Sequence, residues 1–173
     1  MADICQKLKT LVVVCEQNVQ EIGEIRITAP PGVILDPITG LLNVKPTLTV
    51  VDNPVLNDAT LDGKVINYGW VKVLLTITGI AVPVSSYYAI PLQGHISCPD
   101  IQPGDHVQHF PKLEGTLVYA LPSVDPVTGS LSTGVLSLKV AYDVKIVVAR
   151  EQLVSVPVCP PKVNQFQSQL NNK

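Results

Sequence analysis

The chain has 173 residues, a length that allows one domain or two small ones and a sizeable apolar core. Hydrophobic residues make up 46% of it and charged residues only 15%, against about 25% in typical soluble domains, so the folded surface is predicted to be unusually neutral. The formal net charge is -2 and the charges are scattered singly, which excludes the basic surface that nucleic acids or anionic membranes require.

The N-terminal segment, residues 1–22, is interpreted as an extension that precedes the main domain. Its apolar run, Leu11 to Val14, is much shorter than the ~18 residues of a membrane span and too short for a signal peptide. We therefore expect synthesis in the cytoplasm without a signal peptide, and no membrane insertion. Residues Thr10 to Val19 are rich in valine and are a candidate strand for donation to a neighbouring copy.

Residues 23–158 are predicted to form an antiparallel β-sandwich, an all-β fold, because alternation of apolar and polar side chains is their dominant pattern. The alternation is clearest from Val135 to Val148 and recurs from Val65 to Ile77. Shorter strand candidates, rich in Val, Ile, Thr, Leu or Tyr, are Leu11–Val19, Glu24–Thr28, Val44–Val51, Ser85–Pro91, His106–Phe110 and Gly115–Leu121.

Turn signals separate these strand candidates. The 15 prolines and 11 glycines exclude long helices almost everywhere, because proline lacks a backbone donor and clashes inside a helix. An Asp-Pro-x-Thr-Gly sequence occurs twice, beginning at Asp36 and at Asp125. Two independent turn-forming sequences or an internal duplication would both explain this repeated motif. The lack of further similarity around it favours independent turns. Other predicted turns are Pro30–Gly32, Asp52–Pro54, Asp62–Gly63, Pro99–Asp100 and Gln102–Asp105.

The remaining segment, residues 159–173, is predicted to be a flexible polar tail because it is short and rich in Asn and Gln. It begins with Cys159, and the other cysteines are Cys5, Cys15 and Cys98, far apart and without a CxxC motif. This spacing excludes the common zinc and thioredoxin-type motifs. Two interpretations of these cysteines remain: reduced thiols in a cytosolic protein, or intermolecular disulfides formed once the protein reaches an oxidising surface.

The histidines His95, His106 and His109 are the acid–base candidates at neutral pH. His106 and His109 are an odd number of residues apart and point to opposite faces of a strand, so we interpret them as solvated residues rather than zinc ligands. The sequence has no Gly-x-Ser-x-Gly elbow, P-loop or dinucleotide fingerprint. We expect no enzymatic activity, no metal and no cofactor.

Tyr68 and Trp70 are the candidate binding surface. Both lie in the predicted strand from Val65 to Ile77, on the face opposite Val71 and Val73. Two neighbouring rings can form a platform for stacking a sugar, whereas a lone tryptophan in a sandwich usually packs in the core. Core packing of Trp70 is the preferred interpretation.

Several stretches of the chain carry a resemblance to a known family: Gly63–Ile66 with Val71–Val73, Tyr88–Leu92, Pro103–Val107, Pro111–Glu114 and Leu136–Val140. From about Val50 to Val154 the chain resembles the SPOCS or DUF3794 domain of endospore coat and sporulation proteins of Firmicutes. The LysM-type peptidoglycan-binding module of well-known members is absent, so no wall-binding function carries over. The resemblance implies a scaffold role in the spore envelope, with synthesis in the mother-cell cytoplasm and deposition on the spore surface.

Together these features predict a self-associating structural subunit of a spore coat, exosporium or spore appendage. Few charged residues lie on the predicted strand edges, so edge-to-edge pairing between copies meets little electrostatic repulsion. The expected partners are further copies, in an oligomer or polymer, and other spore-envelope proteins. The alternative is a non-catalytic module that binds a glycan or another spore-coat protein.

Overall fold

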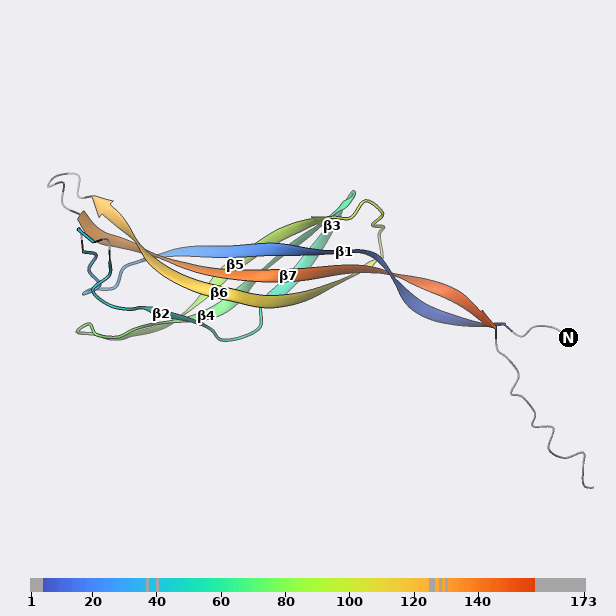
Figure 1. The fold of residues 1–173 in the computed structure, drawn as a ribbon, viewed down its shortest axis with the longest axis horizontal. Helices are drawn as coiled ribbons and strands as arrows, with labels where there is room; N and C mark the ends of the chain where they lie inside the picture. The colour runs from blue at the N-terminus through green and yellow to red at the C-terminus, as the bar shows by residue number, and fades with distance from the viewer. Residues whose placement is uncertain are drawn as a thin grey trace, which may run out of the picture.

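The computed structural model describes residues 5–36, 38–39, 41–124, 127, 129 and 131–157, and this part of the chain consists of strands and their connections. In chain order the strands are β1 (Cys5–Thr28), β2 (Thr47–Val50), β3 (Val55–Leu61), β4 (Lys64–Ile77), β5 (Val84–Ser97), β6 (His106–Val124) and β7 (Leu131–Pro157). They form two antiparallel sheets packed face to face, which confirms the predicted all-β sandwich (Figure 1). Among the described residues, no helix is long and apolar enough to cross a membrane.

The first sheet has the order β1-β7-β6, with β7 in the centre. β1 follows β7 along its whole length, from Cys5 opposite Pro157 to Thr28 opposite Val135. β6 is shorter, and its pairing with β7 ends where His106 lies opposite Ala149. The two long strands therefore continue beyond β6 and twist around each other at one end of the molecule (Figure 1).

The second sheet is built around β4. β5 pairs with the full length of β4 on one edge, while β3 and β2 follow each other along the opposite edge. The β3–β4 hairpin turns at Asp62 and Gly63, as the sequence predicted. Gly63 has a φ of 68°, a left-handed conformation that glycine adopts without a steric penalty.

The core lies between the two sheets and follows the predicted alternation. One face of β7 is at most 3% exposed, and it consists of Leu136, Leu138, Val140, Tyr142, Val144, Ile146 and Val148. The facing side of β4 contributes five fully buried apolar side chains, Val65, Val71, Val73, Leu75 and Ile77. The period of two in each strand thus identified which side chains from both sheets form the core.

Three features of the fold differ from the sequence-based expectations. The segment 5–22 is no separate extension, because it is continuous with 23–28 in β1 and pairs with β7 of its own chain. The predicted strands His106–Phe110 and Gly115–Leu121 are likewise parts of one strand, β6. β3 was not predicted, and it is short and mostly exposed. The predicted tail, residues 159–173, lies outside the described residues.

Candidate functional site

The projecting ends of β1 and β7, residues 5–13 and 149–157, are the most unusual part of the structure, and we call them the ribbon. Within the described residues, β1 is the edge of its sheet, and β7 has no β6 partner beyond Ala149. Both long edges of the ribbon therefore present backbone N–H and C=O groups that none of the described strands pairs.

Apolar side chains occupy both faces of the ribbon. Cross-strand register places Leu8 beside Val154 on one face, and Leu11 and Val13 share the other face with Leu153. These side chains are between 40% and 68% exposed. A two-stranded ribbon without a covering layer is only marginally stable in water, so the ribbon is an incomplete structural unit.

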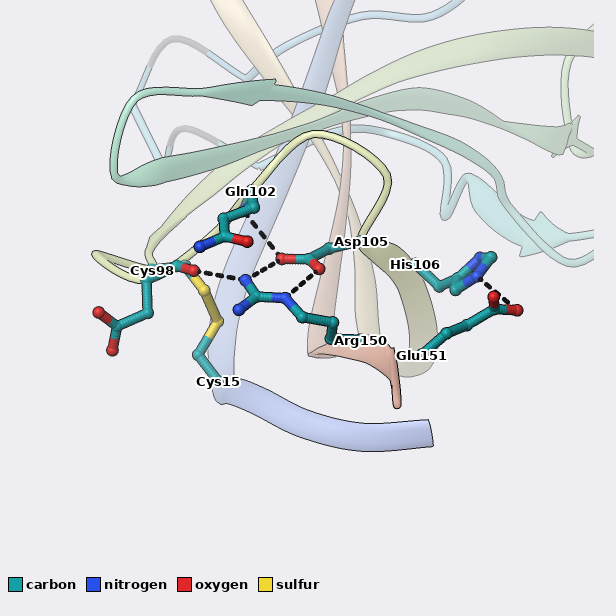
Figure 2. A network of polar contacts seen from close by, with 8 residues as sticks. Cys15, Cys98, Gln102, Asp105, His106, Arg150 and Glu151 are labelled. Carbon is teal, nitrogen blue, oxygen red and sulfur yellow. Dashed lines mark hydrogen bonds and ion pairs between the residues drawn. A yellow bond between two sulfur atoms is a disulfide. The ribbon is translucent and has the colours of Figure 1, made fainter. Parts of the chain in front are cut away.

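A disulfide bond lies at the base of the ribbon. It joins Cys15, just after a register shift in β1, to Cys98, the residue that follows β5 (Figure 2). The edge strand of the first sheet is therefore linked covalently to the second sheet. This in-chain pairing replaces the expectation that Cys15 and Cys98 are reduced thiols or join separate copies. The side chain of Cys5 and the whole of Cys159 lie outside the described part of the chain.

An ion pair next to the disulfide fixes the loop between β5 and β6. The Arg150 guanidinium donates from Nε to Asp105 Oδ1 and from Nη2 to Asp105 Oδ2, both at 2.8 Å, and Nη2 also lies 2.8 Å from the Asp100 carbonyl oxygen (Figure 2). The Gln102 backbone N–H donates to Asp105 Oδ2 at 2.8 Å. The hydrogen bonds from Arg150 hold the pKa of Asp105 at about 2. The carboxylate is thus ionised at neutral pH and ties the loop to β7.

Two charged residues of the ribbon, Lys9 and Glu151, neutralise each other. Glu151 lies 2.5 Å from Lys9 Nζ across the two strands and 3.5 Å from His106 Nε2. The hydrogen bond from Lys9 lowers the pKa of Glu151. Exposed pairs of this kind contribute about 0–1 kcal/mol to stability. Their effect here is to compensate the charges of Lys9 and Glu151, which leaves Lys7 as the remaining charged side chain of residues 5–13.

The three histidines do not form a common site. His106 is exposed, whereas His109 points to the opposite face of β6, where its Nε2 atom is buried without a hydrogen-bond partner. Burial lowers the pKa of His109, with a smaller opposing effect of the Asp58 carboxylate. His95 lies on β5, opposite Ile66 of β4. Among the described residues, no group of three or more His, Cys, Asp and Glu side chains could hold a metal ion.

Tyr68 and Trp70 lie on the outer face of the second sheet. They are 47% and 44% exposed, so the prediction that Trp70 packs in the core was wrong. The physical reason is the alternation of β4, which gives the inner face to its odd-numbered residues, such as Val71. The same outer face carries Lys72, whose Nζ lies 4.7 Å from the centre of the Tyr87 ring.

Sequence reasoning missed the contacts at the base of the ribbon. Asp105 was predicted only as a turn residue, and nothing in the local sequence connects it to Arg150, which is 45 residues away. The disulfide joins residues separated by 83 positions, beyond the reach of any short motif. To predict these contacts, one would first have to predict that β1 pairs with β7, because this pairing brings both contacts to one end of the sandwich.

Comparisons with known proteins identify no relative. No family model, no curated protein and no solved structure matches this chain. The resemblance to spore-coat domains therefore stays a prediction, and the function has to be argued from the ribbon, its base and the exposed aromatic residues.

Proposed function

We propose that the chain is a non-enzymatic structural subunit that associates with further copies of itself through the ribbon. The observation that carries this proposal is the combination of two open strand edges with apolar side chains on both faces of residues 5–13 and 149–157. A neighbouring strand would satisfy the edge hydrogen-bonding groups, and a neighbouring sheet would cover the apolar faces.

The base of the ribbon supports this role by fixing the point where the ribbon leaves the sandwich. The disulfide between Cys15 and Cys98 and the Arg150–Asp105 pair hold the two sheets together where the ribbon begins. A surface that is ordered before binding loses little conformational entropy when a second copy docks. The ribbon is therefore better suited to assembly than a mobile arm of the same composition.

The spore coat, the exosporium or a spore appendage is the proposed location. The support is the resemblance of the chain from about Val50 to Val154 to spore-coat domains. The in-chain disulfide adds a second argument, because structural disulfides persist in oxidising surroundings rather than in a reducing cytosol. Other proteins of the same layer are further candidate partners.

Size-exclusion chromatography with light scattering, followed by electron microscopy, tests the assembly role. We expect the purified protein to form oligomers or polymers whose size increases with protein concentration. A strict monomer at all concentrations, with and without reductant, would contradict the proposal.

A charged residue on the ribbon tests the surface itself. Leu153→Glu introduces charge at a side chain that is 68% exposed, and Val82→Glu is the matched control at a side chain that is 74% exposed and lies before β5. We expect Leu153→Glu to raise the concentration needed for assembly about tenfold or more, equivalent to about 1.4 kcal/mol. Equal effects of the two substitutions would show that the ribbon is not the contact.

A second candidate function is the recognition of a glycan or another coat protein by the outer face of the second sheet. The observation that favours it is the joint exposure of Tyr68 and Trp70, with Trp70 between Val55 of β3 and Pro91 of β5. Exposed rings of this kind can stack on the apolar face of a sugar. Trp70 is the single tryptophan of the chain, so its fluorescence reports on this surface alone.

Titration of the protein with glycans, followed by tryptophan fluorescence, tests this second function. A saturable shift that Tyr68→Ala weakens would support it. An emission spectrum that does not respond to any glycan, from an exposed Trp70, would contradict glycan binding.

A further inference from the structure

A carboxyl group is buried between the two sheets without a charged partner. Glu21 of β1 is 0% exposed, and its Oε1 accepts a hydrogen bond from Nδ2 of Asn67 on β4, which is also 0% exposed. Burying an ionised carboxylate without a counter-charge is far more costly than burying the neutral acid. The protonation state of Glu21 therefore matters for the whole sandwich.

The two atoms that remain without partners identify that state. Glu21 Oε2 and Asn67 Oδ1 are both buried and make no hydrogen bond. If Glu21 were ionised, both atoms would be acceptors and neither could satisfy the other. A proton on Oε2 would turn it into a donor to Asn67 Oδ1. The acid and the amide would then form a ring of two hydrogen bonds, with every polar atom satisfied.

The backbone of β5 leaves space for the Glu21 side chain. Gly94 of β5 lies opposite Asn67 in the sheet. A Cβ atom at Gly94 would be 2.7 Å from Glu21 Oε1 and 2.9 Å from its Cγ, so any other residue would collide with the carboxyl group. Three strands, β1, β4 and β5, therefore meet at Glu21.

The groups that face the pair supply no positive charge. On β7, Tyr142 lies opposite Glu21 and is 3% exposed, and burial raises its pKa, so the phenol is neutral. On β3, Asp58 lies opposite Asn67. On β6, His109 interacts electrostatically with Asp58, and burial lowers the pKa of its imidazole, which favours the neutral form. Desolvation is the larger cause that acts on Glu21, and it raises the pKa, while the Asn67 hydrogen bond lowers it.

We infer that Glu21 is a neutral carboxylic acid in the folded protein and that, with Asn67, it forms a pH-dependent latch between β1 and the second sheet. The latch is independent of the proposed self-association, because it lies inside a single chain. It acts on the strand that also carries one side of the ribbon.

The raised pKa of Glu21 determines the sign of the pH effect. Below the ordinary value of 4.5, both the folded and the unfolded chain hold the proton, and the latch contributes its full stability. Above that value the unfolded chain releases the proton first, so stability falls as pH rises, until the folded chain also releases it. In this window the unfolding constant should rise about tenfold for each pH unit.

Glu21→Gln is the central test, because a glutamine side chain is always uncharged and offers a carbonyl acceptor and an NH2 donor group in place of the two oxygens of the neutral acid. Denaturant unfolding should be measured from about pH 4.5 to about pH 9 for the wild type and the variant. We expect Glu21→Gln to remove the loss of stability with rising pH and to be the more stable protein at high pH. The contribution of His109 is common to both proteins and cancels in the comparison.

Glu16→Gln is the matched control on the same strand. Glu16 is exposed and lies 2.7 Å from Lys145 Nζ on the protein surface. We expect this variant to keep the wild-type loss of stability with rising pH. If Glu21→Gln shows the same pH dependence as the wild type and Glu16→Gln, the latch is refuted.

A titration of the folded wild-type protein decides the protonation state without any substitution. Carbon NMR of the Glu21 side-chain carboxyl group should show a neutral acid at pH values above 4.5, the ordinary value for a glutamate. A Glu21 carboxyl group that ionises at or below pH 4.5 would overturn the inference, even if Glu21→Gln failed to fold.

Discussion

The two halves of the β1–β7 pair have the same backbone pairing, but one half is covered by the second sheet and the other is exposed to solvent. Inside the sandwich, residues 15–28 of β1 pair with 135–148 of β7, and Leu138 is fully buried. In the ribbon the same two strands continue in antiparallel register, yet Leu153 is 68% exposed. The second sheet makes this difference, since it covers the first half and ends before the second. Strand pairing and burial are therefore separate properties of this chain.

The polar groups of the two halves differ in the same way. In the sandwich, Glu21 and Asn67 bond directly to each other out of contact with water. At the ribbon, Lys9 and Glu151 form an exposed ion pair. Burial makes the first pair a strong determinant of stability, whereas solvent screens the second.

A pair of leucine substitutions on β7 would test most directly the difference in burial between the sandwich and the ribbon. Leu138→Ala removes a fully buried side chain from the central strand, and we expect a loss of about 2–5 kcal/mol in the free energy of unfolding. Leu153→Ala should change the unfolding of the monomer by no more than about 0.5 kcal/mol. Chemical denaturation of both variants at a concentration that avoids assembly is the measurement. Similar losses would mean that the ribbon is covered in the monomer.

Removal of the disulfide would remove the covalent link between the two sheets at the point where the two halves meet. Cys15→Ala combined with Cys98→Ala removes a crosslink between residues 83 positions apart, and we expect a loss of about 2–4 kcal/mol. Reduction of the wild type should have a similar effect. Free-thiol counting by mass spectrometry is the control, and two reactive thiols at positions 15 and 98 in the native protein would contradict the pairing.

Gly23→Ala would test how closely β1 of the sandwich half approaches the second sheet. A Cβ atom at Gly23 would collide with the Pro91 carbonyl oxygen and lie 2.6 Å from the Ile90 side chain, so we expect a loss of about 1–3 kcal/mol. Gly115→Ala on β6 is the matched control, because a Cβ atom there would meet nothing within 4 Å. Thermal unfolding of the two variants measures the difference, and equal midpoints would argue against close packing of β1 on β5.

Asp105→Asn should have the smallest effect, present at neutral pH and lost at acid pH. The pKa of Asp105 is lowered from 3.8 to about 2, so the Arg150 pair contributes stability above pH 3.8 that is lost as pH falls towards about 2. We expect Asp105→Asn to be about 1–2 kcal/mol less stable than the wild type at neutral pH, and the two proteins to converge in acid. Unfolding curves at neutral and acid pH measure this, and a constant difference would refute the ion pair.

Much of the sandwich could be predicted from the sequence, because its signals are local. The alternation of β4 and β7 identified the core, and Asp62–Gly63 identified a hairpin turn. The continuity of β1 could not be predicted, since Gln20, Glu21 and Gly23 interrupt the apolar pattern between the predicted strands Leu11–Val19 and Glu24–Thr28. Pairing with β7 keeps these residues in the strand, because it satisfies their backbone groups whatever their side chains are.

The same distinction between local signals and contacts of distant residues applies to the candidate sites. Alternation placed Tyr68 and Trp70 on one face of β4, but a general preference of tryptophan for the core led to the wrong prediction that Trp70 is buried. The Cys15–Cys98 disulfide and the Arg150–Asp105 pair gave no local signal. Each depends on which strands lie side by side, and that choice is made by contacts between distant parts of the chain.

By itself, the sequence determined that this chain forms strands, where several of them turn, and which faces of β4 and β7 are apolar. A period of two is a property of neighbouring residues, so it can be read without knowing the partner strand. The tertiary structure alone decided that β1 and β7 run together past their sheet, that Glu21 meets Asn67, and that a disulfide closes the base of the ribbon. These features join residues 46 or more positions apart, and only the packing of the two sheets brings them together.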